Sequence, residues 1–392
     1  MKKAKPCARA FRAHCGDDYH FTAIAATTIS AIVPFSLRLR ECVLFSKKTR
    51  LLLNGVFPAA FFQTLTIFPL AVKIEYIYSI TLNCFFEVFM ARTLREAYGK
   101  YFKEMLTFSK APDKIDATTI YQEANLQLTK YMDMMLDENL LSGSGLGNEK
   151  NFKDFYDAVV KEGKSGLILM EHFTNLDLPE ILYLLKNNGT EWGEDFSRRI
   201  VAIAGMKLNE ASPEVKIWTE GFTRVVIYPT RSLDKIESEN IDKEVVEEEE
   251  AKARKINFAA MRAMDACKRR GQVILVFPSG TRYRPGKPET KRGLREIDSY
   301  LRLFDVMLLV SINGEALKIN METPDDMLSD YVEPANVVLT ASPVIDCKKF
   351  RDDVLASLPA DEADPKQKTV DRVMQLLEEQ HNRVASEKKL AL

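Results

Sequence analysis

A histidine and an aspartate stand five residues apart, directly after an apolar run. His172 and Asp177 follow residues 166–170, which have the composition of a buried strand. Asp177 suits a helix N-cap and Pro179 suits the first turn of that helix. A neutral histidine can take a proton from an alcohol, and a carboxylate on its other ring nitrogen fixes the tautomer. A histidine that only completes a turn beside a capping aspartate gives the same pattern, so this pair alone leaves both interpretations open.

A basic cluster follows another apolar run. Residues 277–285 read Phe-Pro-Ser-Gly-Thr-Arg-Tyr-Arg-Pro. Gly280 permits close approach of a ligand to the backbone, and Arg282 and Arg284 can hold a phosphate through charge-assisted hydrogen bonds. A basic surface loop is the alternative. A nucleic-acid contact is disfavoured, because no nucleic-acid-binding motif is present.

A third segment, Gly-Phe-Thr-Arg at residues 221–224, begins another strand pattern that ends near Arg231. By itself it indicates only a strand that ends in a basic turn.

In this order and spacing, the three segments resemble the motifs of the glycerolipid acyltransferase family. His172 and Asp177 match its His-x4-Asp motif, and residues 221–224 are similar to its glycine-aromatic-arginine block. Residues 277–282 are similar to the family's Phe-Pro-Glu-Gly-Thr-Arg motif, with serine in place of glutamate. An apolar strand at residues 308–312 fits the fourth motif, so the resemblance covers about residues 150–345.

The Pro-Ser-Gly and Arg-x-Arg-Pro variants resemble the soluble glycerol-3-phosphate acyltransferases of chloroplasts. That resemblance implies that Arg282 and Arg284 bind the substrate phosphate and that Arg231 contributes. Ser232 stands where the family has a histidine, which puts that contact in doubt. Glu171, where the family often has asparagine or serine, has no explanation in the sequence.

The implied reaction moves a fatty acyl group from a thioester of acyl carrier protein or coenzyme A to the sn-1 hydroxyl of glycerol 3-phosphate. We expect His172 to be the general base, Asp177 to orient it, and Arg224 and Gly280 to contribute to substrate binding. The backbone near Gly280 is our assumed source of oxyanion donors. No metal or bound cofactor is implied.

Three alternatives remain. A 1-acylglycerol-3-phosphate acyltransferase would use the same motifs on an acceptor that already carries one chain. A hydrolase with Ser279 as nucleophile lacks the usual Gly-x-Ser-x-Gly elbow. A phosphate- or lipid-binding protein without catalysis would not need both His172 and Asp177.

Strands that alternate with helices after residue 150 predict an α/β fold around a mostly parallel sheet. Ligand sites of such sheets lie beyond the carboxyl ends of the strands. The predicted strands are 166–170, 199–204, 224–228, 272–277, 307–312 and 337–341, and the clearest predicted helices are 243–268 and 367–386. We expect a small helical domain at residues 90–149, which ends in a glycine-rich linker at residues 142–147. A catalytic domain is expected at residues 150–392.

Residues 1–89 are basic and apolar, with no charged residue from 51 to 72. This run is long enough to cross a bilayer, whereas Met90 also resembles a natural start, so both interpretations stay open. The net charge of −1 in 392 residues does not suggest nucleic acid as partner. Six cysteines without a CxxC pair favour a reducing compartment. We therefore expect a cytoplasmic enzyme, peripheral at a membrane surface.

Overall fold

A computed structural model describes residues 92–112, 114–210, 212–229 and 243–390. The chain divides into two units between Met90 and Ala91, and all of the described residues belong to the second unit, Ala91–Leu392. The apolar run at 51–72, Arg231 and Ser232 lie outside the described residues.

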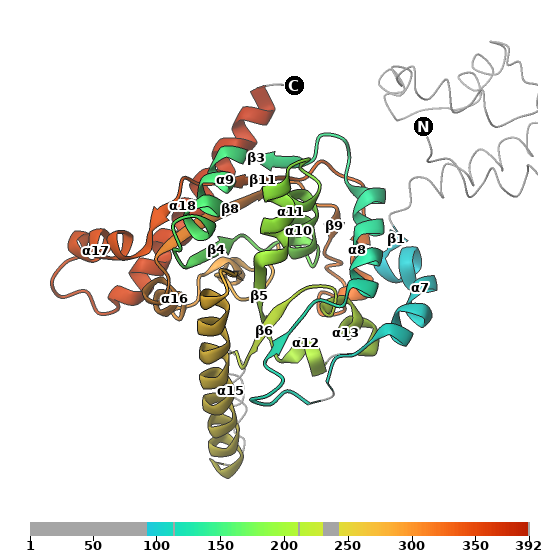
Figure 1. Cartoon of the computed structure of the whole chain (residues 1–392), viewed down its shortest axis with the longest axis horizontal. Coiled ribbons are helices and arrows are strands. Elements are labelled where there is room, and N and C mark those ends of the chain that lie inside the picture. Colours follow the sequence, from blue (N-terminus) through green and yellow to red (C-terminus); the bar gives the residue numbers. More distant parts are fainter. Residues whose placement is uncertain (1–91, 113, 211, 230–242, 391–392) are drawn as a thin grey trace, which may run out of the picture. The chain divides into compact units, whose positions relative to one another are not determined.

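The described unit is built around a mixed sheet whose centre is parallel (Figure 1). The order along the sheet is β2 (Tyr121–Gln122), β6 (Arg224–Ile227), β5 (Ile200–Gly205), β7 (Val273–Val276), β4 (Gly166–Met170), β8 (Val306–Asn313), β11 (Val338–Ala341) and β3 (Gly145–Gly147), and β12 (Ile345–Asp346) also pairs with β8. The five strands from β6 to β8 run parallel, whereas β2, β11 and β12 are antiparallel to their neighbours in this group. The predicted α/β fold with a mostly parallel sheet is confirmed.

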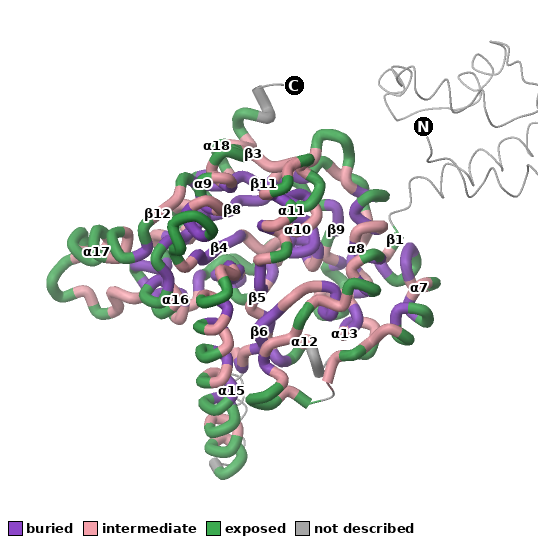
Figure 2. Tube along the Cα trace, in the orientation of Figure 1, coloured by how far each residue is buried: buried purple, intermediate pink, exposed green. Residues whose placement is uncertain are grey.

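The central strands are continuous apolar runs because both faces of the sheet are covered. Every residue of β4, β7 and β8 is buried, and Figure 2 shows the buried strands enclosed by helices with exposed outer surfaces. Their carboxyl ends lie at one edge of the sheet, where His172 follows β4 and Phe277 follows β7. The fold therefore brings the two strongest sequence motifs to the same edge.

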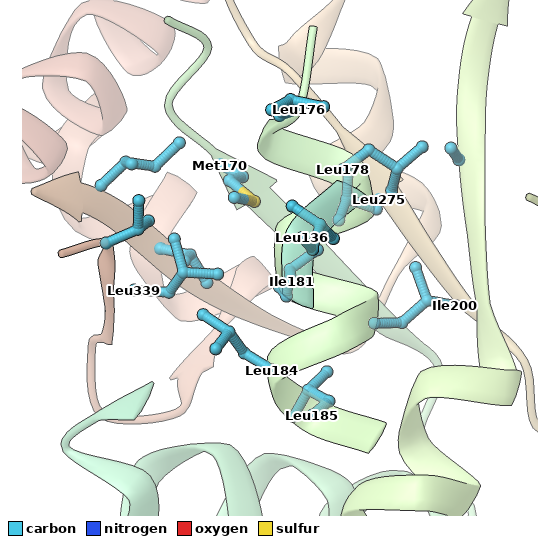
Figure 3. Close-up of a cluster of buried hydrophobic side chains, with 14 of the residues drawn as sticks. Leu136, Met170, Leu176, Leu178, Ile181, Leu184, Leu185, Ile200, Leu275 and Leu339 are labelled. Carbon is cyan, nitrogen blue, oxygen red and sulfur yellow. The ribbon is translucent and has the colours of Figure 1, made fainter. Parts of the chain in front are cut away.

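Helices pack on both faces of the sheet. One buried cluster joins the sheet to α7 (Leu94–Phe108), α8 (Leu126–Asn139), α9 (Glu149–Val160), α10 (Asp177–Lys186), α11 (Glu191–Arg199) and α13 (Pro213–Thr219). The other joins it to α15 (Lys243–Arg269), α16 (Ile297–Leu303), α17 (Cys347–Ser357) and α18 (Pro365–Leu390). Figure 3 shows the first cluster where Ile181 and Leu184 of α10 lie close to Leu136 of α8 and Leu339 of β11.

A second, three-stranded sheet lies outside this path. It contains β1 (Arg92–Thr93), β10 (Tyr331–Val332) and β9 (Leu317–Lys318), all antiparallel. The connection between β9 and β10 includes the short 3-10 helix η2 (Met327–Ser329).

The helices predicted for the segment before residue 140 exist, but they share their core with the sheet and the later helices. Thr93 and Glu96 form a capping box at the start of α7. Buried side chains of α7 and α8, including Met105 and Leu136, belong to the same cluster as those of α10. Residues 92–149 therefore pack into one unit with the sheet.

The glycine-rich segment at 142–147 was expected to be a linker, and this is wrong. Gly145–Gly147 forms β3, an edge strand parallel to β11. A side chain at Gly147 would collide with the Thr340 hydroxyl, so the absence of a Cβ is what lets this strand approach its neighbour.

Across the described ranges, no helix combines the length and the apolar composition that a bilayer span requires.

Candidate active site

His172 and Asp177 form a hydrogen-bonded pair at the carboxyl edge of β4. His172 Nδ1 lies 2.8 Å from Asp177 Oδ2, and the aspartate side chain is buried. Asp177 is the first residue of α10, whose N-cap is Leu176, so the predicted N-cap was one residue too late. Its carboxylate nevertheless lies at the helix N-terminus, where the helix dipole favours negative charge.

Backbone donors determine which atom of the pair carries the proton. Asp177 Oδ2 accepts hydrogen bonds from the backbone N–H groups of Phe173 at 2.6 Å and Thr174 at 3.0 Å. The Thr174 hydroxyl donates to the other oxygen at 2.9 Å. A carboxylate that accepts from this many donors is held as an acceptor, so the histidine supplies the proton on Nδ1. His172 Nε2 is then left with a free lone pair.

The basic turn packs directly against this histidine. The ring of Phe277, just after β7, stacks on the His172 ring with centroids 4.0 Å apart and an interplanar angle of 14°. The backbone N–H of Tyr283 donates to His172 O at 2.8 Å. Because Tyr283 stands between Arg282 and Arg284, the two arginines flank the residue that contacts the histidine. Two motifs more than a hundred positions apart in the chain thus form one site.

A largely apolar cavity of about 460 Å³ reaches His172. It crosses the carboxyl edge of the sheet, since its lining includes Met135 and Val215 from one buried cluster and Met264 and Ile297 from the other. Its volume lies within the range of about 300–1,000 Å³ that is common for small-molecule sites.

Arg282 is held in the interior by a carboxylate that the sequence analysis did not predict. Its guanidinium forms an ion pair with Asp330, and the two side chains are 8% and 0% exposed. Asp330 also accepts from the Asn320 N–H at 3.2 Å and from Asn175 Nδ2 at 3.3 Å. Burial raises the pKa of Asp330, and the Arg282 charge works against that shift. Asn175 lies between His172 and Asp177, so this ion pair also connects the basic turn to the histidine loop.

Arg284 has a different environment. Its Nη2 donates to Asp325 Oδ1 at 2.7 Å, and the Asp325 side chain is 87% exposed whereas that of Arg284 is 23% exposed. The Nε atom of Arg284 is covered and has no hydrogen-bond partner among the described residues. Of the two predicted phosphate ligands, Arg284 is the one whose partner is open to solvent.

Arg224, the third predicted substrate residue in this part of the chain, does not join the site. It is 1% exposed, and its guanidinium donates to the Thr219 carbonyl and to Gln122 Oε1. Burial lowers the pKa of its guanidinium to about 10, so it stays charged at neutral pH. Arg224 ties β6 to β2 and the preceding helix and has no contact with the basic turn among the described residues. Like Arg282 and Arg284, it is not among the residues that line the cavity.

Gly280 lies in the site, but its backbone N–H is already used. The residue has φ of +64° and lines the cavity with His172. Its N–H donates to Phe277 O at 2.9 Å, which closes the turn. The Gly280 N–H is therefore not available to stabilise an oxyanion.

The Ser279 hydroxyl is not positioned as the nucleophile of a hydrolase would be. It donates to Thr281 O at 2.7 Å, and the residue is 5% exposed. No hydrogen bond joins it to His172 among the described residues.

Two acidic groups next to the pair had no role assigned from the sequence. Glu171 Oε2 lies 3.0 Å from His381 Nδ1 of α18 and accepts the Ile312 N–H at 2.8 Å, which accounts for a residue that the family resemblance left unexplained. Glu180, one turn after Asp177, is buried, and one of its carboxyl oxygens has no partner among the described residues. Burial, with the nearby Asp177 charge, raises the pKa of Glu180 well above its ordinary value.

No protein-family model matches the chain, and no curated protein matches it. The described residues contain no group of histidine, cysteine and acidic side chains arranged for a metal ion.

Proposed function

We propose that this chain is an acyltransferase that moves a fatty acyl group from an acyl thioester to a hydroxyl of glycerol 3-phosphate. One observation carries the proposal: a histidine–aspartate pair lies where a mostly apolar cavity meets a turn with two arginines. An acyl chain, a reacting hydroxyl and a phosphate need these three environments side by side.

His172 supplies the proton transfer. Its Nε2 takes the proton of the acceptor hydroxyl as that oxygen attacks the thioester carbonyl, and Asp177 stabilises the imidazolium that forms. When the tetrahedral intermediate collapses, the C–S bond breaks and the thiolate leaves with the proton from the imidazolium. The products are the ester and a free thiol, and His172 returns to its starting state.

The cavity supplies the site for the acyl chain. Apolar side chains dominate its lining, and burying each methylene of a fatty chain contributes about 0.8 kcal/mol. Stacking on Phe277 holds the His172 ring at the cavity wall, where the thioester carbonyl would be presented.

The basic turn supplies the phosphate contact, chiefly through Arg284. The proposal requires that a phosphate bound there lets the rest of a three-carbon acceptor reach His172, and the backbone hydrogen bond from Tyr283 to His172 supports this by joining the basic turn to the histidine loop. In this scheme Arg282 supports the turn from its buried ion pair with Asp330. The same scheme accommodates 1-acylglycerol 3-phosphate as the alternative acceptor, and acyl carrier protein or coenzyme A as the donor carrier. We place the reaction in the cytoplasm at a membrane surface.

The test is thiol release from an acyl thioester by the full chain in detergent, with glycerol 3-phosphate, lysophosphatidate or glycerol as acceptor. We expect release with glycerol 3-phosphate and none with glycerol, and His172→Ala serves as the inactive control. Release with lysophosphatidate alone would move the protein to the second acylation step. If no thiol is released with any of the three acceptors, from either the acyl carrier protein thioester or the coenzyme A thioester, the acyltransferase proposal is rejected.

A further inference from the structure

Both arginines of the basic turn receive their partners from one connection. Residues 319–330, between β9 and β10, supply Asp325 to Arg284, and supply Asp330 and the Pro324 carbonyl to Arg282. The two carboxylates differ in burial: Asp330 is fully buried and Asp325 is almost fully exposed.

We propose that Asp325 occupies the phosphate position on Arg284 and that the acceptor's phosphate displaces it. Asp325 is then a residue that determines specificity, because a ligand must compete with a built-in carboxylate. This inference rests on the proposed function and deepens it.

The geometry of Arg284 favours a phosphate over the aspartate. In a guanidinium group, Nε–H and one Nη–H2 form an edge that matches two oxygens of an oxyanion. Asp325 engages Nη2 alone, through one oxygen at 2.7 Å, and the Nε–H has no partner among the described residues. A phosphate monoester carries nearly two negative charges and three acceptor oxygens, so it can satisfy both donors where the aspartate satisfies one.

The rest of the connection stays anchored when Asp325 leaves. Asp330 is held by Arg282 and by the Asn320 N–H, and Ser329 Oγ lies 2.7 Å from Thr323 Oγ1. Among the described residues, Asp325 has no side-chain hydrogen bond other than the one to Arg284. Exchange at this position therefore breaks one exposed ion pair and leaves the buried one intact.

The same connection also reaches the cavity. Met327 and Leu328 line it within three residues of Asp325. A carboxylate ligand, which carries one charge and two oxygens, gains little over Asp325 itself. The arrangement therefore selects a phosphorylated acceptor and disfavours acceptors that carry only a carboxylate.

The test is direct binding of glycerol 3-phosphate to the full chain by titration calorimetry, without thioester. Asp325→Asn removes the competing charge and keeps the side-chain shape. Glu322→Gln is the matched control, because it removes one charge from an exposed position of the same connection that contacts no arginine among the described residues. Since exposed ion pairs are weak, we expect Asp325→Asn to lower the Kd about two- to five-fold and Glu322→Gln to change it by less than about 1.5-fold.

Arg284→Ala should weaken binding in either background by about ten-fold or more, since it removes charge-assisted hydrogen bonds. The gain from Asp325→Asn should also shrink as salt is raised. If Asp325→Asn binds no more tightly than Glu322→Gln while the wild type binds glycerol 3-phosphate, the competition proposal is wrong and the proposed function stands. If neither the wild type nor Asp325→Asn binds glycerol 3-phosphate, glycerol 3-phosphate is not the acceptor and both proposals fall.

Discussion

Two histidine–carboxylate pairs meet at consecutive residues of one loop. His172 pairs with Asp177 at 2.8 Å, and the preceding residue, Glu171, pairs with His381 of α18 at 3.0 Å. The residue types and the distances are nearly alike, so the difference between the pairs lies in their surroundings.

His172 has a fixed carboxylate on one side and the apolar cavity on the other. His381 packs its ring against Phe173, with centroids 5.6 Å apart, and does not line the cavity. Its partner Glu171 also accepts the Ile312 N–H of β8, so this pair fastens the C-terminal helix to the sheet. Of the two histidine–carboxylate pairs, only the one whose histidine lines the cavity is a candidate catalyst.

The largest expected contrast is in kcat. His172→Ala should lower kcat for thioester-dependent acylation by about 10²–10⁴-fold, since a general base is removed. His381→Ala should leave kcat within about two-fold, because its ring lies outside the cavity. Steady-state assays of both variants, with melting curves to confirm folding, make this comparison. Equal losses in the two variants would show that packing of the loop, and not the base, limits the rate.

The carboxylates give a second contrast. Asp177→Asn can still accept from the backbone N–H groups, but its amide N–H2 can face His172 and favour the tautomer with the proton on Nε2. We expect kcat to fall by about 10²-fold or more, as loss of tautomer control does in comparable pairs. Glu171→Gln should keep kcat, since it only alters the link to α18. A normal kcat for Asp177→Asn would remove Asp177 from the mechanism.

The sequence was most informative for residues that directly follow a buried strand, because the strand determines where they lie. Apolar runs such as 166–170 and 273–276 can be buried on both faces only in a covered sheet, and the residue after each run must then lie at the sheet edge. That is why His172 and the turn after Phe277 could be placed together. Gly145–Gly147 was missed because one apolar residue, Leu146, between two glycines is too short a pattern to indicate a strand. Its pairing with β11 depends on the backbone.

Long-range partners were the part that the sequence could not reveal. Asp330 lies 48 positions from Arg282, and no local spacing indicates that they meet in the interior. A lone arginine at a strand start, such as Arg224, has the same appearance in sequence whether it faces a ligand or, as here, a buried carbonyl. Motif residues therefore predict where their segment lies in the fold. They do not predict which side chains they contact, because those partners come from distant segments.

The smallest expected effect is on thermal stability. It concerns the Glu171–His381 pair, whose contribution to stability depends on pH. The hydrogen bond that His381 donates to Glu171 raises the pKa of His381 above its ordinary value, whereas burial and the neighbouring Lys291 oppose the shift, and Glu315 adds a nearby negative charge. Because the folded-state pKa is the higher one, this stabilisation is fully present below the unfolded-state pKa of about 6.5. It is lost as the pH rises through the folded-state pKa.

Glu171→Gln should therefore lower the Tm by about 1–3 °C at pH 5.5 and change it little at pH 9, since a partly exposed pair contributes at most about 1 kcal/mol. Thermal unfolding of the wild type and of this variant at the two pH values measures the difference, with Glu322→Gln as a control for the loss of one negative charge. A Tm difference that grows toward pH 9 would mean that His381 is not stabilised in its charged form by Glu171. The loop would then have only one functioning pair, and the attachment of α18 would depend on the hydrogen bonds of Gln380 and Asn313.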